Sequence, residues 1–477
     1  MENHDFKLGL TYDDVLLVPQ YSDIESRKFI NLRTYFSRNI QLNLPIVSAN
    51  MDTVTESRMA IAMARVGGIG IIHRFLSIPD QVAEVKKVKR AQNLVIEDPI
   101  TISKEATLEK SLEVMQNNNI SGLLVCDRRG KLEGILTSRD IRFKNNLKMR
   151  VKDAMTPRNK TITAPFGTSA EKALQIFDKY RVEKLPLVDK SNKIVGLITS
   201  SDFQKLNQFS NAAKDSDGQL LVGAAVGVKD GLKRAEALVE AGCNALVIDI
   251  AHGHHKKCID LTRELKRKFK DTDVVAGNVA TIEGTEDLIK AGADAIKVGI
   301  GPGAACSTRI VAGAGVPQLS AILEISPLAR KYKVPLIADG GVKNSGDAAK
   351  AIAAGSSTVM IGNMLAGSYE SPGEYYIEDG LAFKVYRGLA SRDASIDRQT
   401  TEAKADKERQ DRAPEGISFR VTYKGEVKKV LRNLLDGLQS GMSYSGAKTV
   451  EEFWSKAKFI RMTEAGAKES QPRSHQT

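Results

Sequence analysis

The sequence of 477 residues contains only four cysteines, and they are too scattered to form a disulfide framework or a zinc site. No pair has Cys-x-x-Cys spacing, which indicates a reducing compartment without disulfides. Long hydrophobic runs are also missing, which excludes a transmembrane helix. The first residues, Met1–Lys7, are polar and do not resemble a secretion signal. We therefore expect a cytoplasmic protein without a membrane partner.

Aromatic residues make up only 5% of the chain, which leaves few side chains for stacking on nucleic-acid bases. Basic residues outnumber acidic ones by 70 to 58, and the resulting net charge of +12 favours anionic partners. The densest basic cluster, Arg263–Lys270, follows the pattern of an amphipathic helix, so a solvated helix face explains it better than a nucleic-acid patch. Specific nucleic-acid binding is therefore not expected, whereas a phosphorylated metabolite fits the charge.

From about residue 220 onward, short and almost continuously apolar segments alternate with helical patterns such as 231–241 and 283–291. Such strands are buried on both faces and are typical of parallel sheets. Six strands are visible in this region, and two more lie near the N-terminus. The eight predicted strands are 45–48, 68–73, 221–226, 245–249, 274–278, 295–298, 335–339 and 358–362. This count predicts an α/β fold, a (β/α)8 TIM barrel, with an open doubly wound sheet as the competing fold.

Residues 94–205 interrupt the alternation and contain an internal repeat. Gly134–Asp140 (GILTSRD) recurs as Gly196–Asp202 (GLITSSD), and Leu112 and Leu174 keep the same offset. The pattern resembles a tandem CBS (Bateman) module inserted between the second and third barrel strands. Such modules commonly bind adenine or guanine nucleotides such as ATP or GTP, and the resemblance implies that Asp140 and Asp202 contact the ribose. A structural or oligomerisation insert without a ligand is the alternative.

The predicted domains are therefore a catalytic barrel formed by 1–93 and 206–477 and an inserted module at 94–205. Within the barrel domain, 391–416 is a long polar segment, which is typical of a mobile flap over a site. The C-terminal residues 465–477 are predicted to be a disordered tail.

The most informative stretch is Gly299–Arg309 (GIGPGAACSTR), which follows a predicted strand. Its glycines allow the backbone to turn sharply and to approach a ligand closely. The turn carries Cys306, and the hydroxyl of Thr308 follows two residues later. A thiol in this position is placed to act as a nucleophile, and the alternative is a small buried cysteine beside an ordinary turn.

Glycine-rich turns also follow the last two predicted strands, and they predict a phosphate site. The backbone N–H groups of Asp339–Gly341 and Gly362–Asn363 are suited to hold an anion. Asp339 is a candidate acceptor for two ribose hydroxyls, with turn capping as its alternative role. Tyr386 follows shortly afterwards and is placed to donate its phenol hydrogen to the same phosphate.

With these motifs, the chain resembles the IMP dehydrogenase/GMP reductase family over about residues 8–465. The supporting stretches are Leu10–Pro19, Ala49–Glu56, the 299–309 loop, Ile337–Gly341 and Tyr423–Gly425. The resemblance implies that Cys306 attacks C2 of a purine nucleotide and that a hydride passes between C2 and the nicotinamide of NAD or NADP. It also implies that Thr308 and Glu415 handle protons, and that the chain forms a homotetramer or an octamer.

The motifs and the resemblance together give a set of candidate site residues. Those predicted to bind the substrate are Met51, Asp339, Gly340, Gly341, Gly362, Asn363, Tyr386, Gly388 and Leu389. Those predicted to lie near the dinucleotide are Asp249, Asn278, Gly299, Ile300 and Gly301. The resemblance further implies a potassium ion (K+) bound by the carbonyls of Gly301, Gly303 and Cys306.

Two opposed reactions occur in this family, and the flap distinguishes them. The dehydrogenase hydrolyses its covalent intermediate with an Arg-Tyr pair of the flap, in which the arginine is the base for water. The reductase releases ammonia from GMP and needs no such base. In this chain the nearest candidate is Asp397–Gln399, which has Gln399 where the tyrosine is expected. Asp249–Ala251 and Ala304 are smaller departures that also favour a reductase.

Other features favour a dehydrogenase, namely the CBS-like repeat, His252–His254 and Glu370–Glu374. We predict a GMP reductase, which converts GMP and NADPH to IMP, ammonia and NADP. The alternative is an IMP dehydrogenase, which converts IMP, NAD and water to XMP and NADH, with Arg398 or Arg412 as the first candidate base. A second alternative is a non-catalytic regulator that binds purine nucleotides.

Overall fold

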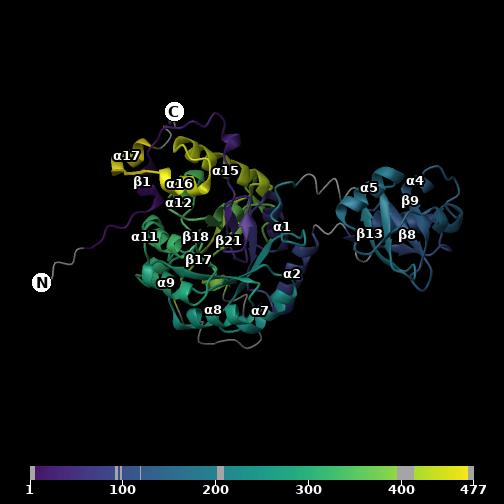
Figure 1. Cartoon of the computed structure of the whole chain (residues 1–477), viewed down its shortest axis with the longest axis horizontal. Helices are drawn as coiled ribbons and strands as arrows, with labels where there is room; N and C mark the ends of the chain where they lie inside the picture. Colours follow the sequence, from purple (N-terminus) through teal and green to yellow (C-terminus); the bar gives the residue numbers. More distant parts are fainter. Residues whose placement is uncertain are drawn as a thin grey trace. The chain divides into compact units, whose positions relative to one another are not determined.

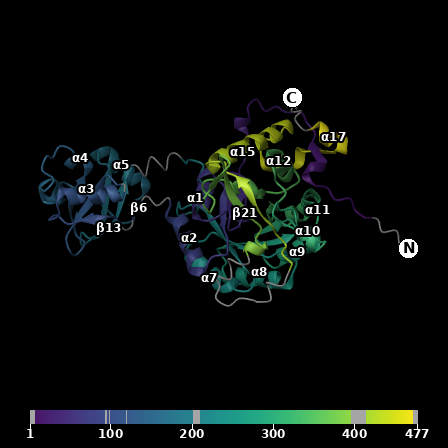
Figure 2. The same ribbon diagram turned by 180° about the vertical axis from the view of Figure 1, so that it is seen from behind.

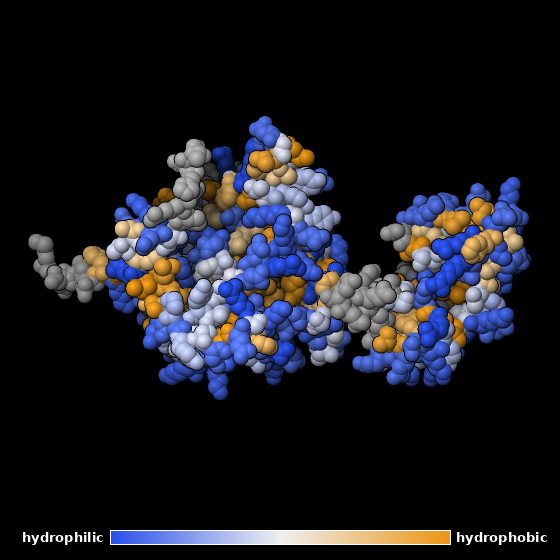
Figure 3. All heavy atoms as spheres, turned by 90° about the horizontal axis from the view of Figure 1, so that it is seen from above, coloured by the Kyte–Doolittle hydropathy of each residue, from blue (hydrophilic) through white to orange (hydrophobic). Residues whose placement is uncertain are grey.

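The structure is a computed structural model that describes residues 6–91, 95–96, 99–118, 120–200, 209–394 and 413–470. The chain divides into two compact units, which Figures 1 and 2 show from opposite sides. The larger unit consists of Met1–Ala91 and Asn211–Thr477, and the smaller unit consists of Gln92–Ser210. On the face drawn in Figure 3, hydrophilic residues cover most of the surface and hydrophobic ones lie in separate patches. No helix in the described ranges is long and apolar enough to cross a membrane.

Eight parallel strands of the larger unit form a closed barrel in the order β14-β15-β16-β17-β18-β19-β4-β5. Closure excludes the competing open sheet, because β5 pairs with β14 and β4 pairs with both β5 and β19. The strands are β4 (Ile46–Ser48), β5 (Ile69–Ile72), β14 (Val222–Val226), β15 (Ala245–Ile248), β16 (Asp273–Val279), β17 (Ala295–Val298), β18 (Leu336–Asp339) and β19 (Thr358–Ile361). All eight predicted strands and the (β/α)8 barrel are therefore confirmed.

Apolar side chains on the strands fill the barrel interior. Val47, Ile71, Val247 and Ile337 are completely buried there, together with Val275. Side chains that are buried on both faces of a parallel sheet account for the continuous apolar runs in the sequence.

Helices surround the barrel (Figures 1 and 2). They are α1 (Ser57–Val66), α2 (Ile78–Arg90), α7 (Gly231–Glu240), α8 (Lys256–Lys268), α9 (Ile282–Lys290), α11 (Gln318–Lys331), α12 (Ser345–Ala353) and α15 (Val427–Tyr444). The basic cluster lies on α8, where Leu261 and Leu265 face the core and Lys268 pairs with Glu236. This is the solvated amphipathic face that the sequence predicted.

Shorter elements complete the larger unit. They are η1 (Tyr12–Asp14), β1 (Val15–Leu17), η2 (Arg27–Phe29), β2 (Thr34–Tyr35), β3 (Gln41–Leu42), α10 (Thr308–Val311), α13 (Asn363–Ala366), β20 (Tyr376–Glu378), β21 (Leu381–Arg387), β22 (Ser418–Thr422), α16 (Val450–Lys456), β23 (Phe459–Arg461) and α17 (Glu464–Glu469). Strands β20, β21 and β22 form a small sheet. Most of the predicted flap, 395–412, lies outside the described residues.

Helix α17 corrects the prediction that the chain is disordered from residue 465. The hydroxyl of Thr463 accepts a hydrogen bond from the Gly466 amide and caps the first turn. This cap satisfies one of the free amide groups at the start of a helix, which the polar composition of the segment concealed. The last residues, 471–477, lie outside the described residues.

The smaller unit contains two four-stranded sheets with the orders β10-β9-β8-β7 and β11-β12-β13-β6. The repeated sequence motif ends β9 (Leu132–Thr137) in one sheet and β13 (Ile194–Thr199) in the other. The other elements are β6 (Val95–Ile96), β7 (Thr101–Ile102), α3 (Leu108–Asn117), β8 (Gly122–Cys126), α4 (Ser138–Ile141), η3 (Val151–Asp153), β10 (Thr156–Pro157), η4 (Arg158–Lys160), β11 (Ala164–Pro165), α5 (Ala170–Tyr180) and β12 (Lys184–Val188). The internal repeat thus corresponds to a repeated strand, helix and hairpin, and its identity as a CBS module stays a prediction.

A buried ion pair joins the two points at which the chain leaves and re-enters the barrel. Lys89 lies near the end of α2 and Asp215 follows the smaller unit, and the lysine Nζ donates to the aspartate Oδ2 at 2.5 Å. The same ammonium donates to the Leu220 carbonyl at 3.3 Å and to Asn244 Oδ1 at 2.9 Å. Burial alone would raise the pKa of Asp215, but the hydrogen bond and charge of Lys89 outweigh it and lower that pKa.

We predict that Lys89→Met lowers the free energy of unfolding by roughly 3 kcal/mol, because it leaves the half-buried carboxylate of Asp215 without its cation. Lys87→Met is the matched control on the same helix. Lys87 pairs with Glu84 but is mostly exposed, so its loss should cost less than about 1 kcal/mol. Denaturant melts of both variants measure the difference. Equal losses would show that the junction does not depend on the buried pair.

Candidate active site

A cavity of about 570 Å³ opens at the end of the barrel where the strands terminate. Its wall is formed by the segments that follow β15, β16, β17, β18 and β19, together with residues near the N-terminus and around Gly388. Every candidate site residue predicted outside the smaller unit lines this cavity. These are Met51, Asp249, Asn278, Gly299, Ile300, Gly301, Gly303, Cys306, Thr308, Asp339, Gly340, Gly341, Gly362, Asn363, Tyr386, Gly388, Leu389 and Glu415.

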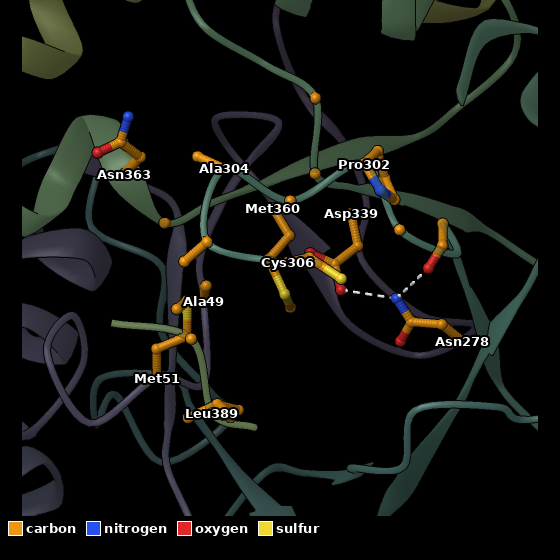
Figure 4. A pocket seen from close by; sticks show the side chains of 18 of the residues that line it. Ala49, Met51, Asn278, Pro302, Ala304, Cys306, Asp339, Met360, Asn363 and Leu389 are labelled. Carbon is orange, nitrogen blue, oxygen red and sulfur yellow. Dashed lines mark hydrogen bonds between the residues drawn. The ribbon is translucent and has the colours of Figure 1, made fainter. Parts of the chain in front are cut away.

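Cys306 lies on the turn between β17 and α10. Its amide donates to the Gly303 carbonyl at 3.0 Å, which closes the turn just before α10 begins at Thr308. Cys306 is exposed, whereas Cys243 and Cys258 are buried. Burial raises the pKa of the Cys243 thiol to about 12. Figure 4 shows the Cys306 side chain directed into the cavity, which argues against the alternative of a small buried cysteine.

A short chain of hydrogen bonds leads from the thiol to a carboxylate. Cys306 Sγ lies 3.2 Å from Thr308 Oγ1, and the threonine hydroxyl donates to Glu415 Oε2 at 2.7 Å. Each group can pass its proton to the next, because a hydroxyl both donates and accepts. The thiol, hydroxyl and carboxylate therefore form a proton relay, which we call the Cys306 relay.

Backbone contacts bring Glu415 to the thiol although the two residues are distant in the sequence. The Ser307 amide donates to the Glu415 carbonyl at 3.1 Å, and the Ile417 amide donates to the Ala305 carbonyl at 3.0 Å. A Cβ on Gly388 would lie 2.6 Å from the Ala305 carbonyl oxygen, so only glycine permits this packing. The relay thus depends on a three-way contact among the Cys306 turn, Gly388 and the 415–417 segment.

A buried lysine connects the two predicted halves of the site. Lys297 Nζ donates to Asp339 Oδ2 at 2.8 Å and also bonds to Asn278 Oδ1. Asn278 Nδ2 donates to the same Asp339 oxygen at 2.9 Å and to the Gly299 carbonyl at 2.8 Å (Figure 4). The side chain of Lys297 is only 4% exposed, so its charge is matched chiefly by Asp339. Asp339, predicted to bind the substrate ribose, and Asn278, predicted to lie near the dinucleotide, are therefore joined by a direct hydrogen bond.

Two further positions of the cavity wall, Gly341 and Gly362, leave room for a ligand only because they are glycine. Gly341 has φ of +82°, and a Cβ there would lie 3.2 Å from the ring of Tyr12. A Cβ on Gly362 would lie 2.9 Å from the Tyr386 hydroxyl and 3.1 Å from Met51 Sδ. Burial raises the pKa of Tyr386, so its phenol keeps its proton at neutral pH. In this structure that hydroxyl donates to Met51 Sδ at 3.5 Å.

Among the charged residues of the cavity wall that sequence reasoning missed are Arg74 and Lys297. Arg74 Nε donates to Asp249 Oδ2 at 2.7 Å, and this ion pair lies beside Ile250. The sequence feature that could have identified Arg74 is its position directly after the predicted barrel strand 68–73, where functional residues concentrate. The signal for Lys297 was a lysine inside an otherwise apolar strand.

The predicted regulatory residues lie elsewhere. Asp140 Oδ2 accepts hydrogen bonds from the amide and the hydroxyl of Thr137, both at 2.7 Å, and so caps α4. Only its Oδ1 remains for a ribose contact. Asp202, Arg398, Gln399 and Arg412 lie outside the described residues.

The described residues hold no cluster of three or more His, Cys, Asp or Glu side chains that suits a metal. The predicted potassium ligands are backbone carbonyls instead, and all three belong to the Cys306 turn. One of them, the Gly303 carbonyl, already accepts the Cys306 amide. A carbonyl oxygen has a second lone pair, so this bond is compatible with a cation. Potassium binding stays a prediction.

Comparison with known proteins agrees with this site. A family model described as IMP dehydrogenase / GMP reductase domain matches residues 9–473. Inosine-5′-monophosphate dehydrogenase of Nitrosopumilus maritimus is 50% identical over 472 residues, which cover 98% of both chains. The same-named protein of Aquifex aeolicus is 51% identical over 467 residues, which cover 97% of this chain and 95% of the relative.

Solved structures give the same result. A cysteine-to-alanine variant of GMP reductase from Trypanosoma brucei, in complex with guanosine 5′-monophosphate, superposes with a TM-score of 0.90. The two chains are 46% identical, and the match covers 100% of this chain and 99% of the other. The chain therefore belongs to the IMP dehydrogenase/GMP reductase family.

Proposed function

We propose that this NAD(P)-dependent oxidoreductase is a GMP reductase, which converts GMP and NADPH to IMP, ammonia and NADP. The observation that carries the choice is the sequence between Gly388 and Glu415, which contains no tyrosine. The Arg-Tyr pair expected of a dehydrogenase is therefore missing, and with it the expected base for water. The Cys306 relay supports the same choice, because it supplies the proton that a departing amine requires.

In the first step of the proposed reaction, Cys306 Sγ forms a bond to C2 of the purine. The thiol proton passes to Thr308, and the threonine proton passes to Glu415. The relay then returns one proton to the amino group as the C2–N bond breaks, and neutral ammonia leaves. The 2.7 Å bond between Thr308 and Glu415 suits this transfer without a rearrangement.

In the second step a C2–H bond replaces the C2–S bond, and Cys306 leaves as a thiolate that takes a proton from water. When bound, a nicotinamide dinucleotide would supply the hydride for this bond and would itself be oxidised. Asp249 and Asn278 would hold it, since both line the cavity. A volume of about 570 Å³ lies within the usual range of ligand sites.

Substrate binding is assigned to the turns that follow the strands β18 and β19. The N–H groups of Gly341 and Gly362 would receive the phosphate, and Asp339 would accept the ribose hydroxyls. Lys297 and Asn278 both donate to Oδ2 of Asp339. The other oxygen of this carboxylate, Oδ1, is therefore left for the ribose.

Three further assignments complete the proposal. Potassium binds the carbonyls of the Cys306 turn, and the inserted unit binds ATP or GTP. The chain assembles as a homotetramer or an octamer. These assignments rest on the family resemblance and on the sequence motifs.

IMP dehydrogenase is the second candidate, because the curated relatives described above carry that name at about half identity. In that case Arg398 or Arg412 is the first candidate for the water-activating base. A non-catalytic regulator fits less well, because the exposed thiol and the Cys306 relay are both in place.

The first prediction concerns direction. The purified protein is expected to consume NADPH when GMP is present, and the absorbance of the reduced nicotinamide should fall. IMP with NAD should give no increase in absorbance, because the reverse of the proposed reaction requires ammonia. Released ammonia, measured with a coupled assay, should equal the NADPH consumed. Rapid formation of XMP from IMP and NAD, with GMP left unchanged, would identify a dehydrogenase instead.

The second prediction concerns the relay. Glu415→Gln should lower kcat by about 100-fold or more while the KM for GMP stays nearly constant, because the variant loses a proton donor rather than a binding group. Cys306→Ala should abolish turnover and keep GMP binding, as calorimetry can show. Glu378→Gln, in β20, is the control and should behave like the native protein. A normal kcat in Glu415→Gln would refute the role of the relay.

A further inference from the structure

A second cavity, of about 390 Å³, lies at the opposite end of the barrel. It is bounded by β2, the last turn of α11, α16 and the residues that lead into β18 and β19. The first cavity is built where these two strands end, at Asp339 and Gly362, so the two cavities sit at opposite ends of the same strands. None of the residues of the active site contributes to the second cavity.

Two aromatic side chains line this second cavity. The indole Nε1 of Trp454 donates to the Ser356 carbonyl at 3.0 Å, which fixes the orientation of the ring. Tyr35 is 45% exposed. In the described part of the chain neither ring stacks on another ring, so both are left to contact a ligand. Fixed aromatic surfaces of this kind suit a flat ring system.

The cavity also carries an excess of positive charge. Arg38, Arg330 and Lys333 line it, and Glu451 is the only acidic residue among the lining residues. Arg330 and Lys333 form no ion pair with any other part of the described chain, and both are exposed. Three cations against one carboxylate match a phosphate monoester, which carries about −1.5 to −2 charges near pH 7.

Two serine side chains add hydroxyl groups to the wall of this cavity. Ser326 is 2% exposed and Ser357 is 4% exposed, and both line the cavity. Neither side-chain hydroxyl makes a hydrogen bond within the described residues, so both are available to a ligand in the cavity. A Cβ on Gly355 would lie 2.6 Å from Ser326 Oγ and 3.6 Å from Arg330 Nη1, so the glycine keeps this wall open.

We propose that this cavity is a second nucleotide site, which binds a nucleoside monophosphate. Trp454 and Tyr35 contact the base, and Arg330 and Lys333 bind the phosphate. Glu451 and the two serine hydroxyls match the hydroxyl groups of a ribose, because a carboxylate accepts hydrogen bonds and a serine both donates and accepts. The site is independent of the direction of the reaction at Cys306, and it lies outside the inserted unit.

The chain contains a single tryptophan, so intrinsic tryptophan fluorescence reports directly on this cavity. The full-length protein is titrated with each of the four ribonucleoside monophosphates. At least one, of which UMP is informative because the other predicted sites take purines, should change the emission in a saturable way at submillimolar concentration. The matching nucleoside and inorganic phosphate alone should each bind at least about tenfold more weakly, since each lacks half of the contacts.

Variants at and just after the C-terminal end of α11 locate the effect. Arg330→Gln and Lys333→Gln should each weaken binding about tenfold, the loss expected for one charge-assisted hydrogen bond. Lys331→Gln is the control, because Lys331 lies between them in sequence and does not line the cavity. All three positions are exposed, so the variants should keep the native Tm. No saturable change with any nucleotide, unchanged binding in Arg330→Gln, or equal binding of phosphate alone would each overturn the proposal.

Discussion

Closure of the barrel is the constraint on which both cavities depend. Because β5 pairs with β14 and β19 pairs with β4, all eight strands run in one direction around a closed ring. Every strand end therefore lies on one rim, where Asn278, Asp339 and the Cys306 turn meet although they are distant in the sequence. The starts of the strands form the other rim, where β2, the end of α11 and α16 bound the second cavity.

Lys297 illustrates the free-energy penalty of placing a charged side chain inside an apolar barrel. An unpaired ammonium at 4% exposure would be strongly destabilising, and Asp339 and Asn278 offset that cost. Replacing the lysine by an apolar residue would leave the Asp339 carboxylate without its cation. The same bonds fix the orientation of both partners, so binding surfaces on two strands are held in register by one buried side chain.

Features that are local in sequence were predictable, and features that join distant segments were not. The strands were found because each is a continuous apolar run, and Cys306 because its turn is rich in glycine. The Arg74–Asp249 pair and the Lys297 bonds connect different strands, so no single stretch reveals them. Asp140 was predicted to bind ribose, but its contact with Thr137 is a local helix cap that sequence reasoning did not consider. The cap of α17 was overlooked because composition was given more weight than position.

The contacts that place Glu415 have a consequence for how this family diverges. Two of the hydrogen bonds that hold the 415–417 segment against the Cys306 turn use only main-chain atoms, at Ser307 and Ala305. Main-chain bonds do not depend on the side chains of the preceding flap, so substitutions within 395–412 are expected to leave these bonds in place. The sequence of the flap can therefore change, and with it the second reactant that we propose for this site, while Glu415 keeps its place beside Thr308 and Cys306.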